Sequence, residues 1–395
     1  MNSFTRHDSG ENQVRARPKW REAVAEGLHQ TGALRIFEAV SRHYEFALSN
    51  HRRLPFLRRT TCPKFAVLCY HRIGTRGVPL FSVFAPEVFE AEMRFLRKHY
   101  RVISLDRLCD EMEKPGQNEP AVAVTFDDGY RDLYTYALPI LQKYQIPATI
   151  FLPIVSIETG QVPWYDRVFL TAKVFPKDDL EIVLDRSRRF RLVSYQARLQ
   201  AATEIVQYLR TLPDWRRKEH CERLEKQVSL PIDELRNRML TWDQIRTMGR
   251  TGITFGSHTM THPVVSQLTD AQLESELNES KQLLEQRIAG PAPHFAFPFG
   301  KPEDCGKAAL PVLARAGYRS AATTVEGTNV PGDSLYELRR SQVGSEPSVS
   351  MFALKLSRLF LAAVEHSATA PSVSSALARR AISDSAQSQS GARRA

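Results

Sequence analysis

The sequence predicts an α/β protein, a distorted (β/α) barrel of about seven strands that carries a mainly helical insertion. Three observations support this. Short apolar runs alternate with stretches of helical spacing along most of the 395 residues, as in parallel strands covered by helices. The reactive side chains fall at or just after the ends of these runs, where α/β barrels collect their chemistry. Between about 164 and 240 the alternation gives way to helical patterns rich in Arg and Lys, which indicates an insertion.

The first part of the barrel is expected to contain three strands, and the last of these is the central one. A buried strand is expected at Phe65–Tyr70, ending at His71 before a loop rich in Gly and Pro. Pro86 then opens a helix, because Pro is tolerated at the first helical position. A short strand is expected over Tyr100–Leu105. Alternating β-branched and apolar residues make Val122–Phe126 the central buried strand, and it runs directly into two neighbouring carboxylates.

The rest of the barrel follows the same rhythm. A helix from about Asp132 to Tyr144 should be kinked by Pro139, and a capping box at Thr241–Gln244 opens another helix. Further strands are expected at Ala148–Leu152, Ile253–Ser257, His294–Pro298, Arg319–Thr324 and Leu338–Val343. Further helices are expected at Asp270–Ile288 and Ala308–Ala316, with Glu303 and Asp304 between them in a solvated loop.

The ends of the chain differ in composition from the folded domain, which is expected over 63–345. Residues 1–62 should form a polar tail and a basic amphipathic helix, which either lies on a membrane or partner or packs on the domain. A C-terminal helix and a disordered tail are expected over 346–395. The N-terminus lacks the apolar core of a secretory signal, so a location in the cytoplasm, or peripheral to the inner face of the membrane, is expected.

Composition restricts the class of protein. A hydrophobic content of 42% and a charged content of 25% are ordinary for a globular protein with a sizeable core. The net charge of +10 would suit nucleic acid or an anionic membrane surface, but no helix-turn-helix, finger or stacking platform accompanies it, so no nucleic-acid partner is expected. Five cysteines without a CxxC pair predict neither a disulfide framework nor a cysteine metal site, and they suit a reducing compartment.

Two motifs carry the chemistry. Asp127 and Asp128 follow the central strand, and burying both is costly unless a cation or a chemical task occupies them. Taken alone, a solvated strand-to-helix turn would also explain them. His258 and His262 lie four residues apart and would point the same way if the segment turns helically. Two imidazoles and one carboxylate make an open site for Zn²⁺ or a similar ion, and the other carboxylate stays free as a base, a set that suits amide or ester hydrolysis.

The two motifs together resemble those of a known family. Thr125-Phe-Asp-Asp-Gly129 and Ser257-His-Thr-x-x-His262 are similar to the motifs of the polysaccharide deacetylase family (carbohydrate esterase family 4, the NodB-homology domain), and the similarity runs from about Val67 to Val343. Tyr70-His71 at the end of the first strand resembles the permuted subgroup that includes poly-N-acetylglucosamine deacetylases. The resemblance implies a distorted barrel that removes acetyl groups from N-acetylated sugars with a divalent metal, usually zinc.

The resemblance also assigns roles. Asp127 would be the catalytic base. The stretch Phe295–Gly300 occupies the place of the third motif, often Arg-x-Pro-Tyr, so Pro298 would contact substrate and the backbone N–H of Phe299 would help to stabilise the oxyanion. The implied metal ligands are Asp128, His258 and His262.

Two departures from the family pattern matter. The Arg of the third motif falls at Ala296, so nothing there can orient Asp127, and Arg340 in the last strand is the candidate substitute. The usual C-terminal Leu-x-x-His, source of the general acid, is missing after Val325. His71 is therefore expected to protonate the departing amine. The alternative is that His71 is a packed residue at the end of its strand.

Several aromatic residues could line a sugar site. Trp164, Tyr165 and Trp242 could form a stacking wall, and Tyr130 closely follows the implied metal carboxylate. Since aromatic residues are more often part of a core, Trp164 and Tyr130 are the candidates for substrate binding and Trp242 is expected to pack. Asp166 is a candidate to reach the site beside Trp164.

The leading hypothesis is thus a metal-dependent deacetylase acting on an acetamido sugar of an exopolysaccharide, a cell-surface glycan or a lipid-linked precursor. One alternative keeps the site but changes the bond, to an acetyl ester or another linear amide. A second alternative is a non-catalytic barrel that binds a glycan or a partner. The partners expected are an N-acetylated carbohydrate and, through the N-terminal helix or the insertion, a membrane surface or a synthase.

Overall fold

The computed structural model describes most of the chain between residues 64 and 361. The described residues are 64–74, 83–114, 119–183, 187–228, 230, 238–343 and 348–361. The tail and helix expected within 1–62 and the tail expected at the C-terminus lie outside the described residues. Among the helices of the described residues, none is both long enough and apolar enough to cross a membrane.

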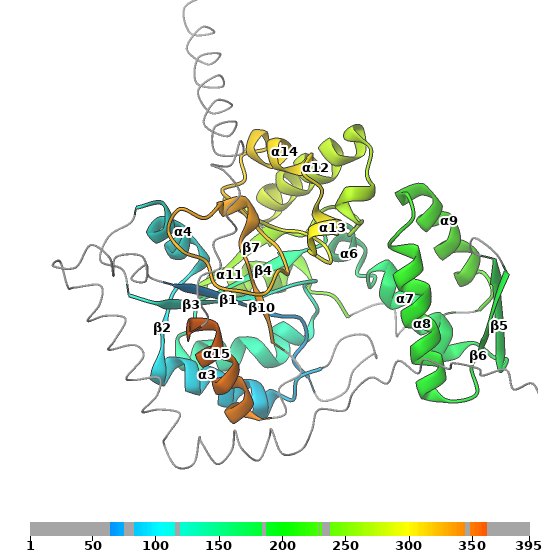
Figure 1. Cartoon of the computed structure of the whole chain (residues 1–395), viewed down its shortest axis with the longest axis horizontal. Coiled ribbons are helices and arrows are strands. Elements are labelled where there is room, and N and C mark those ends of the chain that lie inside the picture. The colour runs from blue at the N-terminus through cyan, green and yellow to red at the C-terminus, as the bar shows by residue number, and fades with distance from the viewer. Residues whose placement is uncertain are drawn as a thin grey trace, which may run out of the picture.

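A single curled sheet of eight strands, all paired in parallel, forms the body of the molecule (Figure 1). The order along it is β10-β1-β3-β4-β7-β8-β9, and β2 pairs with the start of β3. Every residue of β1 and β3 is buried, because helices cover one face and core side chains the other. The strands are β1 (Phe65–Tyr70), β2 (Arg101–Val102), β3 (Ala121–Phe126), β4 (Ala148–Leu152), β7 (Ile253–Ser257), β8 (His294–Ala296), β9 (Ser320–Ala322) and β10 (Ser341–Gln342).

The segment from Leu338 to Gln342 brings the two ends of the sheet together. Leu338 forms a parallel bridge to Ala322 in β9, and three residues later β10 begins to pair with β1, at Leu68 and Cys69. The last strand of the barrel therefore returns to the first, which confirms the predicted distorted barrel of about seven strands.

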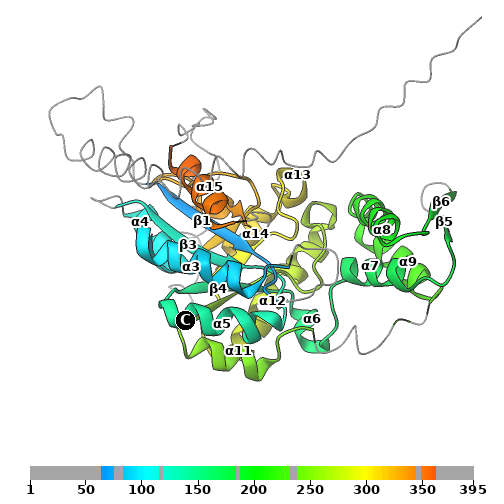
Figure 2. The same cartoon turned by 90° about the horizontal axis from the view of Figure 1, so that it is seen from below.

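Helices pack around the outside of the sheet (Figures 1 and 2). Helix α15 packs on α3 and α3 on α5, while α12 contacts both α11 and α14. The capping box expected at Thr241–Gln244 is present, and a second one at Thr269 and Gln272 begins the helix predicted over Asp270–Ile288. The helices are α3 (Pro86–His99), α4 (Leu105–Glu113), α5 (Leu138–Tyr144), α6 (Ile154–Thr159), α11 (Trp242–Gly249), α12 (Asp270–Ile288), α13 (Pro302–Cys305), α14 (Ala309–Arg315) and α15 (Val349–Leu361).

Several predicted elements differ in extent from those observed, and the strand expected over Leu338–Val343 is only the two residues of β10. The strand expected over Tyr100–Leu105 is only the two residues of β2, because the hydroxyl of Ser104 accepts a hydrogen bond from the Arg107 N–H and starts α4. Ahead of Pro139, the helix takes the wider π-helical form over Leu133–Ala137 (η2). Proline has no N–H to donate, and the hydrogen-bond pattern of the helix widens just ahead of it.

The insertion is mainly helical, as predicted, and has its own apolar core. Helices α7 (Trp164–Val174), α8 (Tyr195–Leu209) and α9 (Asp214–Glu225) pack together beside a hairpin that was not predicted, β5 (Asp179–Val183) with β6 (Ser187–Arg191). Figure 1 shows the insertion at one side of the barrel.

A partly buried ion pair connects the insertion to the barrel. Arg210, at the end of α8, donates two hydrogen bonds of 2.9 and 2.7 Å to the carboxylate of Asp304 in α13, and its guanidinium lies 4.2 Å from the centre of the Phe299 ring. The expectation that Asp304 lies in a solvated loop is wrong, since its side chain is buried against this arginine.

Candidate active site

Asp127 and Asp128 leave the end of β3 in a tight turn. The Asp127 N–H donates to the carbonyl of Tyr70, and the Gly129 N–H turns back to the carbonyl of Asp127 at 2.9 Å. Asp128 and Gly129 both have positive φ, of 70° and 66°. A Cβ on Gly129 would lie 2.5 Å from a methyl carbon of Leu152, so glycine is required there. The turn lets the two neighbouring carboxylates meet different partners.

Asp128 faces two imidazoles. Its Oδ1 lies 3.3 Å from Nε2 of His262 and 3.7 Å from Nε2 of His258. The other ring nitrogen of His258 is 2.7 Å from the carbonyl of Ala296, which orients Nε2 toward Asp128. Burial lowers the pKa of His258 to about 4, so this imidazole is neutral at neutral pH, the form that binds metals.

These three residues fit a divalent metal ion. All three are buried, and among the described residues neither carboxylate oxygen of Asp128 has a hydrogen-bond donor. Burial raises the pKa of Asp128, but the adjacent imidazole of His262 outweighs it and holds the pKa below its ordinary value. A buried, ionised carboxylate without donors is costly unless a cation faces it, and a set of two nitrogens and one oxygen suits zinc.

The segment that carries the two histidines is a loop, so the helical turn assumed from their spacing is wrong. Thr259 and His262 have positive φ, and the Thr259 hydroxyl accepts a hydrogen bond of 3.0 Å from the His262 N–H. The carboxylate of Glu276 in α12 accepts from the N–H groups of Met260 and Thr261 at 2.8 and 3.0 Å. Glu276 thus fixes the loop from a distant helix, and no local sequence signal could have pointed to it.

Backbone strain concentrates at the site. Among the described residues, six non-glycine residues have positive φ, and four of these lie here. Such conformations are costly for residues with a Cβ and persist where the surroundings determine the geometry, often at functional sites. The four are Asp128, Thr259, His262 and Phe299.

Arg340 holds the other carboxylate. Its two terminal nitrogens donate to the two oxygens of Asp127 at 2.7 and 2.8 Å, and its Nε donates to the carbonyl of Thr323. Arg340 is fully buried and lies in the segment that joins β9 to β1. Burial raises the pKa of Asp127, but the charge of Arg340 outweighs it and holds the pKa well below its usual range, so the carboxylate is ionised. The structure brings the candidate substitute for the missing motif Arg to Asp127.

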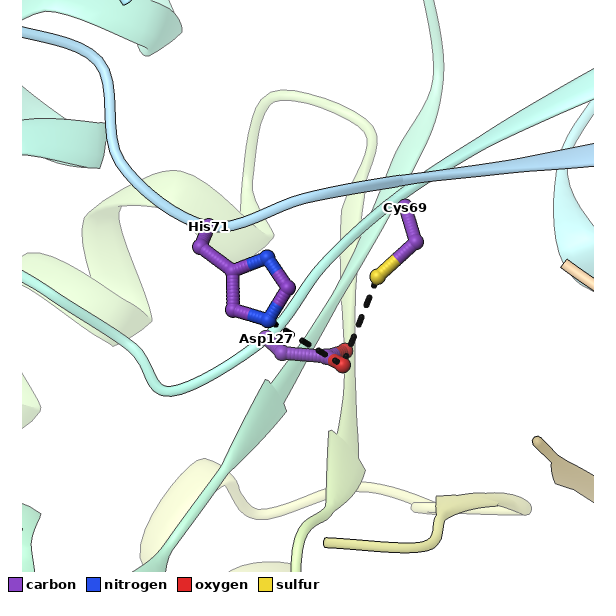
Figure 3. Close-up of side chains that lie close together, drawn as sticks. All are labelled: Cys69, His71 and Asp127. Carbon is purple, nitrogen blue, oxygen red and sulfur yellow. Dashed lines mark hydrogen bonds and ion pairs between the residues drawn. The ribbon is translucent and has the colours of Figure 1, made fainter. Parts of the chain in front are cut away.

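His71 lies on another side of the same carboxylate. Its Nε2 is 4.0 Å from Oδ2 of Asp127, and its side chain is 17% exposed, whereas Asp127 is buried (Figure 3). Cys69, two residues earlier in β1, lies 3.4 Å from the same oxygen through its sulfur. His71 therefore stands next to the candidate base with one face open to solvent, and its role as general acid stays a prediction.

The third motif forms a second tight turn beside the metal candidates. Phe299 has a φ of 61°, and the Gly300 N–H donates to the carbonyl of Pro298 at 2.6 Å. The ring of Phe299 packs edge-on against that of His262, with their centres 5.1 Å apart. Thr324 holds the turn from β9 by two hydrogen bonds. The proposed roles of the Phe299 N–H and of Pro298, which is buried, stay predictions.

The two aromatic candidates for substrate binding are buried and hydrogen-bond to residues at or next to the site. Tyr130 is fully buried, and its hydroxyl donates to Asp166 at 2.7 Å. Trp164 is 4% exposed, and its Nε1 donates to the carbonyl of His262 at 3.0 Å, while the guanidinium of Arg217 covers its ring. Burial raises the pKa of Asp166 to about 6. Direct contact of either ring with a sugar stays a prediction.

Comparisons with known proteins agree with this site. The family model described as polysaccharide deacetylase matches residues 114–186 and 192–321, half of the chain. The match includes the two carboxylates and both histidines, while His71 and Arg340 lie outside it.

Three relatives illustrate the similarity. The chain is 25% identical over 294 residues to the candidate polysaccharide deacetylase YxkH of Bacillus subtilis (strain 168), covering 73% of this chain and 75% of that protein. It is 29% identical over 101 residues to the poly-β-1,6-N-acetyl-D-glucosamine N-deacetylase of Staphylococcus epidermidis, covering 25% of this chain and 34% of that protein. The structure of the Streptococcus pyogenes deacetylase PplD in complex with acetate aligns with a TM-score of 0.51 at 20% identity, over 75% of this chain and 99% of that one, a likeness of fold. The chain belongs to the polysaccharide deacetylase family, whose members are hydrolases acting on C–N bonds of acetamido sugars.

Proposed function

We propose that this protein is a metal-dependent hydrolase that removes N-acetyl groups from an acetamido sugar of an exopolysaccharide, a cell-surface glycan or a lipid-linked precursor. One observation carries the proposal. Two adjacent buried carboxylates have opposite surroundings. Asp128 faces two imidazoles and accepts no hydrogen bond within the part of the chain that the structure describes, and Asp127 is held ionised by Arg340. Such a pair divides metal binding from proton transfer.

Asp128, His258 and His262 would hold the metal, with zinc the best match to two imidazoles and a carboxylate. When bound, such an ion polarises the acetamide carbonyl and lowers the pKa of a water molecule.

Asp127 and His71 would move the protons. Arg340 fixes the plane of the Asp127 carboxylate and uses one lone pair on each oxygen. The other lone pair of Oδ2 accepts a weak hydrogen bond from the Cys69 thiol at 3.4 Å, which the attacking water would displace as it gives its proton to Oδ2. Because Arg340 also lowers the basicity of Asp127, the carboxylate would hold that proton only briefly. His71, 4.0 Å away and partly exposed, would donate a proton to the departing amine.

The backbone N–H of Phe299 would stabilise negative charge on the carbonyl oxygen. The left-handed turn at Phe299 is held by hydrogen bonds from Thr324 to the Phe299 and Gly300 carbonyls, so the N–H needs no rearrangement during the reaction.

The net charge of +10 supports a proposal for where the enzyme acts. We place it in the cytoplasm or at the inner face of the membrane, where an excess of Lys and Arg favours an anionic surface. The segment 1–62 or the insertion would provide the contact with the membrane or with a synthase. Recovery of the protein outside intact cells would contradict this placement.

A panel of substrates scored by released acetate tests the function. The panel holds N-acetylglucosamine oligomers with β-1,4 and β-1,6 linkages, an acetylated sugar ester and a linear N-acetyl amine. The proposal predicts acetate from an oligomer, loss of activity after chelation, and recovery with one equivalent of zinc. A preference for the ester or for the linear amide would show that the enzyme hydrolyses that bond rather than the acetamide of a sugar. If the protein neither binds metal nor releases acetate, the alternative of a non-catalytic, glycan-binding barrel would be supported instead.

A further inference from the structure

A second group of metal-binding side chains lies beside the proposed metal site and shares none of its ligands. It consists of Cys69 in β1, His71 just after β1 and Asp127 just after β3, whose ligand atoms all lie within 4.8 Å of one another. Figure 3 shows the thiol and the imidazole pointing toward the same carboxylate from neighbouring parts of the chain. The absence of a CxxC pair predicted no cysteine metal site, but here the fold brings together residues that are 58 positions apart.

The spacing of the three ligand atoms is close to that of a zinc site. In a tetrahedral site with Zn–S of about 2.3 Å and Zn–N and Zn–O of about 2.0 Å, the ligand atoms lie roughly 3.3 to 3.6 Å apart. The sulfur of Cys69 and Oδ2 of Asp127 are already 3.4 Å apart. Nε2 of His71, at 4.0 Å from Oδ2, must move closer, and its side chain is the partly exposed one of the three.

Asp127 has room for an ion despite its pair with Arg340. Each carboxylate oxygen offers two lone pairs, and Arg340 uses one on each. The remaining lone pair of Oδ2 accepts a hydrogen bond of 3.4 Å from the Cys69 thiol, and a bound ion would replace this bond once the thiol is deprotonated. The thiol of Cys69 would lose its proton to solvent as the sulfur–metal bond forms. The positive charge of Arg340 opposes a cation here, so this site should bind more weakly than the one at Asp128.

We propose that Cys69, His71 and Asp127 form a second, weaker site for a thiophilic divalent metal such as zinc, and that an ion bound there switches the enzyme off. The ion would occupy Oδ2 of Asp127 and Nε2 of His71, the two atoms that carry protons in the proposed reaction. The inhibition rests on that proposed function, whereas the binding rests only on the geometry. The enzyme would then be active with one equivalent of zinc and inhibited by excess zinc.

Cobalt titration of the metal-free full-length protein tests the binding. A cobalt–thiolate bond gives a charge-transfer band in the near ultraviolet, and the site at Asp128, His258 and His262 contains no sulfur. The first equivalent should therefore give no such band and the second should give one. Cys69→Ser should bind the first equivalent as the wild type does, which also shows that it folds, and should lose the band. Cys109→Ser, a change at another buried cysteine, in α4, should keep it.

Acetate release under increasing zinc tests the inhibition. Wild type and Cys109→Ser should lose activity beyond one equivalent, while Cys69→Ser should keep, as zinc increases, whatever activity it shows at one equivalent. The absence of the charge-transfer band at the second equivalent of cobalt, or its persistence in Cys69→Ser, would overturn the site. If the band appears at the second equivalent of cobalt but excess zinc does not inhibit the enzyme, the inhibitory role would be overturned. Since the band needs no substrate, failure of the deacetylase assay would not be mistaken for failure of the site.

Discussion

The guanidinium of Arg340 donates two parallel hydrogen bonds, of 2.7 and 2.8 Å, to the carboxylate of Asp127, although 213 positions separate the two residues. Both side chains are buried, so removing one partner would leave an uncompensated charge in the interior. Arg340 lies in the segment that brings the last strand back to β1. Closing the barrel and orienting the candidate base are therefore achieved by the same few residues.

Arg340→Lys should lower kcat on the order of 10²-fold, because Lys keeps the positive charge but cannot hold the carboxylate plane with two parallel bonds. KM should change little, since Arg340 is buried away from substrate. Steady-state kinetics measure kcat and KM, and a thermal melt of the same preparation shows that the variant is folded. Arg319→Lys, which changes partly exposed ion pairs with Asp110 and Glu113, should leave kcat unchanged. Wild-type kcat in Arg340→Lys would contradict the orienting role.

His71→Ala should lower kcat for an N-acetylated sugar on the order of 10² to 10⁴-fold, because the amine would have to leave without a proton. Its metal content at one equivalent should equal that of the wild type, since His71 is not among the ligands of the tighter site, Asp128, His258 and His262. Hydrolysis of 4-nitrophenyl acetate should be far less affected, because a nitrophenolate leaves without protonation. Equal losses on both substrates would show that His71 is not the acid.

Glu276→Ala should weaken zinc binding about 10- to 100-fold, the usual effect of removing a group that orients metal ligands. The carboxylate holds the backbone of Met260 and Thr261, so its loss lets the loop that carries His262 relax. Competition with a chromophoric chelator gives the affinity. Glu279→Ala, an exposed change on the same helix, is the matched control. Unchanged affinity in Glu276→Ala would mean that the loop needs no such support.

Asp166→Asn should change how stability depends on pH. Burial raises the pKa of Asp166 from 3.8 to about 6, so between these values the folded state binds more protons than the unfolded state. Stability of the metal-free protein must then fall as pH rises from about 4 to 6, by about 3 kcal/mol for this one group. The variant should lose this part of the slope. A slope from Asp132, whose pKa burial also raises to about 6, should remain. Identical urea unfolding profiles for wild type and Asp166→Asn across this range would count against the assignment.

Local patterns predicted the strands and most helices well. Continuous apolar runs gave β1, β3 and β4, a capping box gave the start of α11, and helical spacing of apolar residues gave both ends of α12. The hairpin β5–β6 was missed because its strand Ser187–Arg191 is largely Arg and is stabilised by pairing rather than by an apolar pattern. The shape of the His258–His262 loop was also missed, since it depends on Glu276 rather than on local spacing.

The candidate site, too, could be predicted from local motifs only in part. The metal group could be expected from two short motifs, and the pairing of Arg340 with Asp127 from the absence of the motif Arg. The proximity of Cys69 to Asp127 depends on the parallel register of β1 and β3, which places Cys69 opposite Thr125. The burial of Trp164 under Arg217 depends on how the insertion packs, and residue type alone could not show it.

The division of labour between the two aspartates is the central claim, and zinc content measured together with acetate release tests it most directly. Asp127→Asn should retain one zinc per chain yet release acetate from an N-acetylglucosamine oligomer on the order of 10² to 10⁴-fold more slowly, because an amide cannot accept the proton. Asp128→Asn should lose both the zinc and the activity, because a neutral amide is a poor zinc ligand. Zinc lost from Asp127→Asn, or turnover close to wild type in either variant, would contradict the account.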